Sequence, residues 1–350
     1  MTFNNNNKFS SILTRKQNDT KNAYKSKKRG TNKTLIQNKN KNRGTHQTRI
    51  QNKSKKRGTH QTRIQNKNKN KNRILNKNLY KTKKNILNTK EVIVQSLWVG
   101  PRLSRMEYYS IKSFLTLGYT FHLYTYEKVK NIPKGTIVKN ASEIMPAKDI
   151  FDLKSTYLPF SDIWRYKMLH DKGNYWVDLD MIALKKFDFD TDKDKYVFSS
   201  ERTIQEGAYK SRSKKVPNIG VLKAPKGSPF YLEAYEKCLA FNTNKKNDDK
   251  LKYMKMLRAL IKKHDMEKYV KEPKLFCNLD WWHSREAFEV HKKYPKKYGV
   301  PAPTINSMFR GPYTVHFWRD RVTKKYGLKL DDVYDDECLW EKMIKHIDAR

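Results

Sequence analysis

Cysteine and long apolar runs are scarce in this chain of 350 residues. The three cysteines, Cys238, Cys277 and Cys338, are odd in number and widely spaced, which excludes a disulfide framework and a zinc pattern. No apolar run reaches the length of a membrane span, and the polar segment Met1–Ser10 does not read as a signal peptide. We therefore expect a cytoplasmic protein.

Glycine-rich phosphate loops are also missing. The 13 glycines form neither a Gly-x-Gly-x-x-Gly nor a Gly-Lys-Ser/Thr motif. Their absence disfavours dinucleotide binding and P-loop chemistry.

Acidic residues are few, and the excess of basic residues is uneven. The chain has 76 Lys and Arg against 35 Asp and Glu, and residues 1–90 hold 27 of the basic residues and a single acid, Asp19. An Arg-Gly-Thr triplet recurs there every 14 residues, beginning at Arg29, Arg43 and Arg57. Each repeat has too few aliphatic residues to bury a core, so we expect residues 1–90 to be a disordered, low-complexity tail.

Two interpretations of this tail stand side by side. Lys and Asn accumulate where codons are AT-rich, as in intracellular parasites and large DNA viruses, and repeats expand by slippage. The alternative is electrostatic attachment to nucleic acid, an anionic membrane or an acidic glycan. The aromatics Phe3, Phe9, Tyr24 and Tyr80 are too scattered for base stacking, which favours the first interpretation over a specific nucleic-acid role.

The centre of the sequence carries the strongest pattern. Ser161 is a good helix N-cap, Gly173 suits the helix end, and residues 175–177 predict a short strand. The strand leads into Asp178 and Asp180, whose carboxylates point the same way if the chain stays extended. Such a pair suits a divalent cation that keeps open positions for phosphates, although a lone Asp-x-Asp usually marks a solvated turn.

These residues resemble the glycosyltransferases that carry a DXD sugar-binding region, of the family 32 type, which include initiating mannosyltransferases and capsular polysaccharide enzymes. The family pattern is Ser-Asp-x-x-Arg-Tyr, followed by Gly-Gly-x-Tyr-x-Asp-x-Asp. The matching residues here are Ser161-Asp162, Arg165-Tyr166, Gly173-Asn174-Tyr175 and Asp178-Leu179-Asp180. Asn174 replaces the second glycine, and asparagine tolerates the left-handed conformation.

The resemblance implies an α/β fold of GT-A type, a Rossmann-like mixed sheet with flanking helices. It implies a retaining transfer from a UDP- or GDP-sugar to a glycan, protein or lipid acceptor, with Mn²⁺ or Mg²⁺ as cofactor. Asp180 would bind the metal directly, and Asp178 would do so through water or would contact ribose and sugar hydroxyls. Asp162 would bind donor hydroxyls, and Arg165 would steer the phosphates or hold Asp162.

Five further residues are site candidates through the same resemblance. His316, in a His-x-Trp pattern, would be the third metal ligand, with Trp318 near the sugar. Trp98 would lie against the base, and Tyr175 and Asn218 would border the donor. The plainer alternatives are that Trp98 and His316 are core residues and that Asn218 satisfies a turn.

We expect a glycosyltransferase domain over residues 91–325, with a solvated, variable helical insertion at 245–275 and a helical tail at 326–350. The aromatic segment Phe276–Trp282 is a candidate wall of the acceptor groove. The expected strands are Val92–Leu97, Tyr119–Tyr126, Thr136–Lys139, Tyr175–Val177, Tyr196–Ser200, Pro217–Ala224 and Thr314–Trp318.

Three alternatives remain open. Val177–Asp180 is similar to the Asp-x-Asp strand of haloacid-dehalogenase-type phosphatases, although those enzymes carry it on their first strand. The basic tail is compatible with a non-enzymatic nucleic-acid-binding protein. An inactive glycosyltransferase fold used as a scaffold is the third alternative, and the retained acids disfavour it.

Overall fold

The computed structural model describes residues 92–152, 156–189, 194–205, 212–242, 252–291, 297–300 and 304–350. The tail predicted at 1–90 lies outside the described residues. The compact unit that spans residues 88–350 is a mixed α/β domain, so the predicted α/β class is confirmed.

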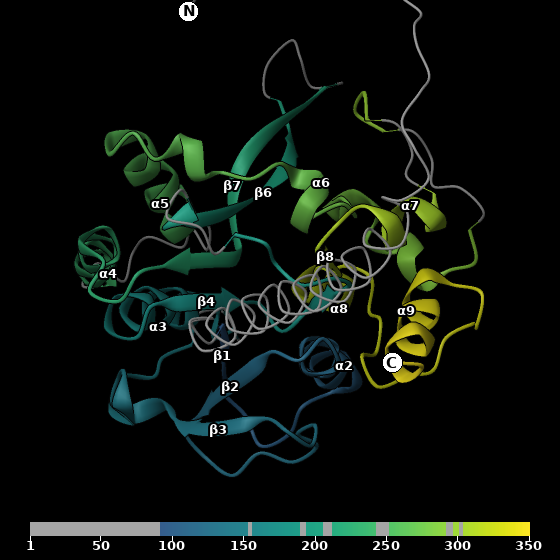
Figure 1. Ribbon diagram of the computed structural model, residues 1–350, viewed down its shortest axis with the longest axis horizontal. Coiled ribbons are helices and arrows are strands. Elements are labelled where there is room, and N and C mark those ends of the chain that lie inside the picture. Colours follow the sequence, from purple (N-terminus) through teal and green to yellow (C-terminus); the bar gives the residue numbers. More distant parts are fainter. Residues whose placement is uncertain are drawn as a thin grey trace, which may run out of the picture. The chain divides into compact units, whose positions relative to one another are not determined.

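A six-stranded mixed sheet organises this domain, with strand order β3-β2-β1-β4-β7-β6 (Figure 1). Strands β1 to β4 run parallel, whereas β7 is antiparallel to both β4 and β6. A second sheet pairs β5 with β8. The strands are β1 Ile93–Trp98, β2 Thr120–Thr125, β3 Ile137–Asn140, β4 Asn174–Val177, β5 Met181–Ala183, β6 Val197–Ile204, β7 Ser213–Ala224 and β8 Thr314–His316.

The strand order reverses between β1 and β4. The chain moves outward from β1 to β2 and β3, then returns through α3 (Leu158–Asp171) to place β4 on the other side of β1. In open α/β sheets, ligands bind outside the carboxyl ends of the strands at such a switch point. In this chain Trp98 ends β1, and Asp178 directly follows β4.

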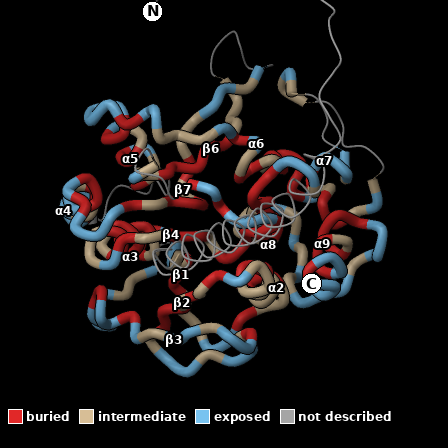
Figure 2. Tube along the Cα trace, viewed as in Figure 1, coloured by how far each residue is buried: buried red, intermediate tan, exposed pale blue. Residues whose placement is uncertain are grey.

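Helices cover both faces of the sheet (Figure 1). On one face, α3, α4 (Pro229–Asn242) and α5 (Lys252–Lys263) pack against Trp176 and Leu222. On the other face, α2 (Arg105–Thr116) and α6 (Pro273–Phe276) pack against Val94, Tyr175 and Val221. Buried residues follow the central strands and α3 (Figure 2), so the polar residues found there need a specific reason.

Two segments expected to be peripheral belong to this core. One face of α5, which includes Tyr253, Leu257 and Ile261, is buried against α3 and α4, so this part of the expected insertion is not a solvated appendage. In the expected C-terminal tail, α9 (Leu339–Asp348) buries Trp340 and Met343 in a cluster shared with α2 and β8. Both helices are amphipathic, and burial of the apolar face decides their place.

The helix before the Asp-x-Asp begins earlier than the sequence predicts. It starts at Leu158, with Pro159 in its first turn, so Ser161 is an internal residue and not the N-cap. Proline is favoured in a first turn, where its missing N–H costs no hydrogen bond. The predicted turn is correct, because Gly173 and Asn174 both have left-handed backbones, with φ values of 67° and 65°.

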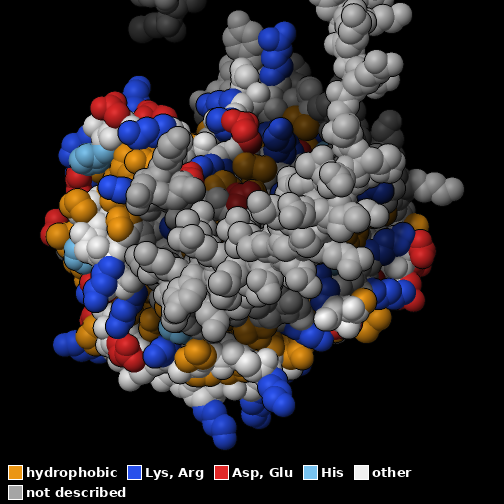
Figure 3. Space-filling view, viewed as in Figure 1, with side chains coloured by type: hydrophobic (Ala, Val, Ile, Leu, Met, Phe, Trp, Pro, Cys, Tyr) orange, Lys and Arg blue, Asp and Glu red, His pale blue; other side chains and the backbone are white. Residues whose placement is uncertain are grey.

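The remaining short helices are α7 (Ile305–Arg310), α8 (Arg319–Lys324) and the 3₁₀ turns 141–143, 147–149, 267–269, 281–283 and 286–288. Among the described residues, no helix combines the length and apolar composition needed to cross a membrane. In the described part of the face seen in Figure 3, Lys and Arg side chains are spread around the surface and do not form one stripe.

Candidate active site

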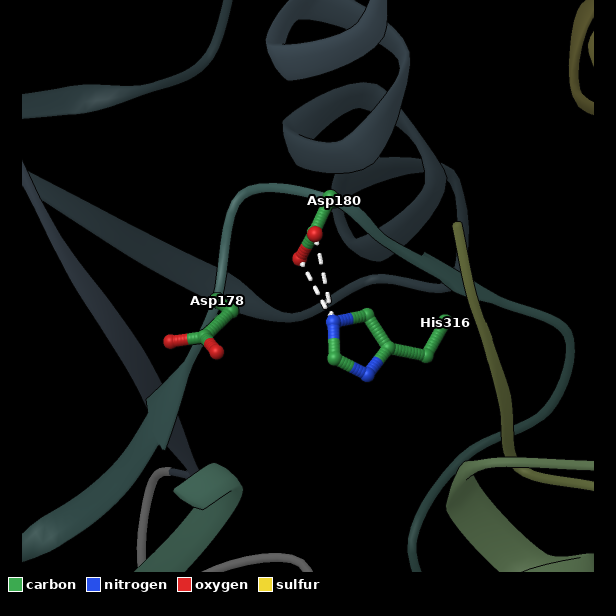
Figure 4. A group of neighbouring side chains, drawn as sticks. All are labelled: Asp178, Asp180 and His316. Carbon is green, nitrogen blue, oxygen red and sulfur yellow. Dashed lines mark hydrogen bonds and ion pairs between the residues drawn. The ribbon is translucent and has the colours of Figure 1, made fainter. Parts of the chain in front are cut away.

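Two carboxylates and one imidazole gather beside the switch point of the main sheet. Asp178, Asp180 and His316 each offer a ligand atom, and these atoms lie within 4.8 Å of one another (Figure 4). The two aspartates converge because the chain turns after β4, with the N–H of Met181 donating to the carbonyl of Asp178 at 3.3 Å. The extended backbone that the sequence predicts for residues 178–180 is therefore wrong.

Pairing of β5 with β8 brings His316 to the aspartates. Met181 lies opposite His316 in the antiparallel register, which places the imidazole beside Asp180. The backbone N–H of Phe317 donates to the Asp180 carbonyl at 2.9 Å, and that of Arg319 donates to Asp180 Oδ2 at 2.8 Å. The segment after β8 therefore wraps around Asp180 and fixes its carboxylate.

Asp180 and His316 form an ion pair. Nε2 of His316 lies 3.1 Å from Oδ2 of Asp180. Burial acts to raise the pKa of Asp180, but the charge and hydrogen bond of His316 and the Arg319 N–H together lower it below its ordinary value. Burial acts to lower the pKa of His316, and the interactions with Asp180 and Cys277 outweigh it and raise that pKa well above its ordinary value.

The donor set fits a divalent cation. Oδ1 of Asp180 is buried and accepts no hydrogen bond from the described residues, although His316 Nε2 lies 3.1 Å from it as well. The described donors to Asp178 all reach its Oδ1, which leaves Oδ2 for a ligand. Two carboxylates and one imidazole suit Mn²⁺ or Mg²⁺ better than a soft metal. A cation at this place would take the position of the proton that His316 and Asp180 share.

Arg165 ties α3 to the Asp-x-Asp. Its Nη1 donates to Asp178 Oδ1 at 3.0 Å and to the Ile219 carbonyl at 3.1 Å, and its Nη2 lies 3.1 Å from Asp162 Oδ1. The guanidinium also lies over the Trp176 ring at 4.5 Å. Only 2% of the Arg165 side chain is exposed, so it holds the two aspartates and does not reach into solvent for phosphates.

Asp162 is enclosed behind this arginine. Only 4% of the residue is exposed, and burial raises its pKa to about 7, although Arg165 acts in the opposite direction. Burial likewise raises the pKa of Asp178, against the effect of Arg165. In this arrangement Asp162 orients Arg165, and Arg165 orients Asp178.

Trp318 holds His316 from the side. The two rings stack with centroids 3.9 Å apart and an interplanar angle of 27°. Trp318 has a left-handed backbone with φ of 57°, which is rare for a bulky residue, and its Nε1 donates to the Leu279 carbonyl at 2.9 Å. On the far side of the imidazole, Nδ1 lies 3.8 Å from Sγ of Cys277.

Trp98 lies at the same sheet edge as Asp178, at the end of β1, and is partly exposed. The Arg319 guanidinium lies over its ring at 5.4 Å. Tyr175, in contrast, does not reach the site. Strand residues alternate between faces, so Trp176 and Asp178 point toward α3, whereas Tyr175 is fully buried on the opposite face against Phe187.

Asn218 borders the site but is already satisfied. Its Oδ1 accepts from the Gly220 N–H at 2.6 Å, and its Nδ2 donates to Glu201 at 2.6 Å. Gly220 in turn accepts a hydrogen bond from the N–H of Asp178 at 2.8 Å. A Cβ at Gly220 would lie 2.9 Å from Asn218 Oδ1 and 3.7 Å from Asp178 Oδ2, so this corner is closely packed and a larger side chain would disturb it.

The aromatic segment Phe276–Trp282 is mostly core. Phe276 and Trp282 are buried, and Trp281 is partly exposed, with its Nε1 donating to the Arg202 carbonyl at 3.1 Å. Of the aromatic residues in this segment, Trp281 is thus the partly exposed one.

Sequence reasoning missed four residues around the cluster. Glu201 and Gly220 adjoin Asn218, Arg319 adjoins Asp180 and Trp98, and Glu107 binds Arg319. Arg319 follows the His-x-Trp pattern directly, which was an available signal. Glu107, Glu201 and Gly220 lie far from Asp178 and Asp180 in the sequence, and no pattern around them pointed to the site.

Comparisons with known proteins give weak similarities. No protein-family model and no curated protein matches the chain. A solved structure titled PaToxG Glycosyltransferase matches with a TM-score of 0.37 and 13% identity, over 51% of this chain and 72% of that chain. The apo form of the glycosyltransferase GlyE from Streptococcus pneumoniae TIGR4 matches with a TM-score of 0.34 and 14% identity. That match covers 53% of this chain and 46% of GlyE, less than half of its length.

Proposed function

We propose that this chain is a metal-dependent glycosyltransferase of GT-A type. It transfers a sugar from a UDP- or GDP-sugar to a glycan, protein or lipid acceptor, with retention of configuration. One observation carries the proposal: Asp178, Asp180 and His316 converge beside the β1/β4 switch point of a mixed α/β sheet. This is where such sheets bind nucleotides, and a hard cation there suits a diphosphate.

Asp180 and His316 would hold the cation, with Asp178 contributing Oδ2 directly or through water. When bound, Mn²⁺ or Mg²⁺ neutralises the negative charge that develops on a diphosphate leaving group. Asp180 is preorganised for this by two backbone N–H groups, and His316 by its stacking on Trp318. Preorganised ligands need no rearrangement at the moment of reaction.

The other residues orient the donor. Arg165 fixes Asp178 from behind through a charge-assisted bond, and Asp162 fixes Arg165 in the same way; Asp162 and Arg165 are both nearly buried. Trp98 offers an aromatic edge to the base at the end of β1. Asn218 and Asp178, which pack around Gly220, border the donor sugar in this proposal. The leaving phosphate deprotonates the acceptor in this proposal, which therefore needs no protein base.

The phosphatase alternative fits less well. A phosphatase of that type uses the first aspartate as nucleophile. Here Asp178 Oδ1 accepts hydrogen bonds from Arg165 at 3.0 Å and Trp176 at 2.9 Å, which stabilise the carboxylate and weaken its nucleophilicity. The motif also follows β4 and not the first strand. The nucleic-acid-binding alternative depends on the basic residues of 1–90, which lie outside the described residues.

The test is sugar transfer and donor hydrolysis over a panel of UDP- and GDP-sugars, with and without Mn²⁺. The wild-type chain is compared with Asp180→Asn and with Asp171→Asn. Asp171 is a matched control, because it is a partly exposed aspartate of α3 that pairs with Lys167. We expect Mn²⁺-dependent turnover of one donor, lost in Asp180→Asn and kept in Asp171→Asn. No turnover and no Mn²⁺-dependent donor binding would reject the proposal.

A further inference from the structure

The side chain of one arginine beside Asp178, Asp180 and His316 does not take part in the arrangement described above. Arg319 lies between Asp180 and Trp98: its N–H donates to Asp180 Oδ2 at 2.8 Å, and its guanidinium lies over the Trp98 ring at 5.4 Å. Its side chain is 42% exposed, whereas that of Arg165, the other arginine bound to the aspartates, is 2% exposed. Of these two arginines, only Arg319 is open to a ligand.

Glu107 binds the Nε edge of the Arg319 guanidinium and does not bind its Nη1–Nη2 edge. Nε of Arg319 donates to Glu107 Oε1 at 2.6 Å. The two Nη groups have no hydrogen-bond partner among the described residues. The Nη1–Nη2 edge is a planar fork of donors that matches two oxygens of a phosphate.

Glu107 is itself held rigidly. Its side chain is fully buried, and its Oε2 accepts from the N–H of Ser104 at 2.8 Å in the capping box of α2. The strained Trp318 backbone, with φ of 57°, turns the chain just before Arg319. The guanidinium is therefore oriented by Glu107, by the Trp98 ring and by the turn at Trp318, before any ligand binds.

We infer that Arg319 binds the diphosphate of the nucleotide donor, with Glu107 as its positioning residue. The inference rests on the proposed function, because it assigns a phosphate contact within that same site. A diphosphate bound at Asp180 and a base near Trp98 would bring negative charge to the place between them, where the free fork of Arg319 lies. Arg319 then neutralises charge on the side of the diphosphate away from Arg165.

The test measures binding of UDP and GDP in the presence of Mn²⁺ by isothermal titration, and of uridine and guanosine by NMR. The variants are Arg319→Ala, Arg319→Lys and Arg285→Ala. Arg285 is a matched control, because its Nε also donates to a glutamate, Glu289, at 2.7 Å, and its side chain is 60% exposed. Mn²⁺ affinity is measured in parallel by electron paramagnetic resonance.

We expect Arg319→Ala to weaken binding of the preferred nucleoside diphosphate about 10-fold or more, because charge-assisted bidentate bonds are lost. Nucleoside and Mn²⁺ affinities stay within about 2-fold, since the Arg319 N–H to Asp180 remains. Arg319→Lys keeps the charge without the fork and is expected to fall between wild type and alanine. It supplies the same comparison if the alanine variant unfolds. Arg285→Ala is expected to bind like wild type.

A double-mutant cycle tests the positioning role. Glu107→Gln is expected to weaken diphosphate binding by a smaller factor than Arg319→Ala, and to add nothing further in the Arg319→Ala background. Additive effects would refute the coupling. The inference is overturned if Arg319→Ala binds the nucleoside diphosphate like wild type, or loses nucleoside binding equally. Absence of any nucleotide binding by the wild-type chain is a different result, and it rejects the proposed function itself.

Discussion

The imidazole of His316 and the indole of Trp318 stack face to face, with their centroids 3.9 Å apart. The stack is made by a residue with a left-handed backbone, and that backbone also directs the N–H of Arg319 to Asp180. One strained residue thus orients two members of the cluster. Strain of this kind persists only where surrounding contacts impose it, and it is concentrated at functional sites.

Removing the stack of His316 on Trp318 should lower the Mn²⁺ affinity while the protein stays folded. We expect Trp318→Ala to reduce Mn²⁺ affinity about 10-fold or more, as the loss of a group that orients a ligand does. Trp318→Phe keeps an aromatic face but not the hydrogen bond to Leu279, and its loss should be smaller. Electron paramagnetic resonance measures the affinities, and thermal unfolding checks the fold. Equal Mn²⁺ affinity in all three proteins would contradict a positioning role for Trp318.

Arg165 should be essential for stability as well as for the site. Arg165→Ala leaves Asp162 buried and Asp178 partly buried without their shared cation, and we expect it to lower the free energy of unfolding by about 3–5 kcal/mol. Lys167→Ala, on the same helix, removes a pair with Asp171 whose two side chains are both about a quarter exposed, and should cost under about 1 kcal/mol. Urea denaturation measures both. If both variants lost a similar free energy of unfolding, Arg165 would contribute no more to stability than a surface ion pair does.

A substitution at Gly220 tests whether the closely packed corner beside Asp178 belongs to the donor site. In Gly220→Ala the new Cβ lies 2.9 Å from Asn218 Oδ1, so either Asn218 or the strand must shift. We expect a cost of about 1–3 kcal/mol in stability and weaker donor binding. In Gly311→Ala the nearest atom is 3.9 Å away, an ordinary contact, and that variant should behave like wild type. Donor affinity that is unchanged in Gly220→Ala would remove this corner from the site.

Substitutions of Tyr175 should change the stability of the fold and not the affinity for the donor. Because it faces the core against Phe187, we expect Tyr175→Phe to bind the donor like wild type. Tyr175→Ala should lower the free energy of unfolding by about 3–5 kcal/mol, as aromatic truncation in a core does. Titration calorimetry and urea denaturation separate the two effects. A large loss of donor affinity in Tyr175→Phe would place this hydroxyl in the site after all.

The local pattern in the sequence predicted much of this structure. The left-handed pair at Gly173 and Asn174 follows from residue chemistry alone. The helix start near Ser161 was misplaced because a proline two residues earlier also suits a first turn, and tertiary packing extends the helix to it.

The features that could not be predicted depend on contacts between residues that lie far apart in the sequence. The position of His316 depends on β5–β8 pairing, and the position of Arg319 depends on Glu107. The face of β4 that carries Tyr175 could not be told from periodicity, because both faces of this strand are covered by helices and its residues 175–177 are all apolar or aromatic.

The central claim is that Asp180 and His316 hold a divalent cation that binds the donor diphosphate. The most direct measurement is an Mn²⁺ titration followed by electron paramagnetic resonance, with and without UDP or GDP, for the wild-type chain, Asp180→Asn and Asp171→Asn. We expect one site per chain whose affinity rises when one of the nucleotides is present, lost in Asp180→Asn and kept in Asp171→Asn. Mn²⁺ binding that is absent, or equal in Asp180→Asn and wild type, would contradict the account.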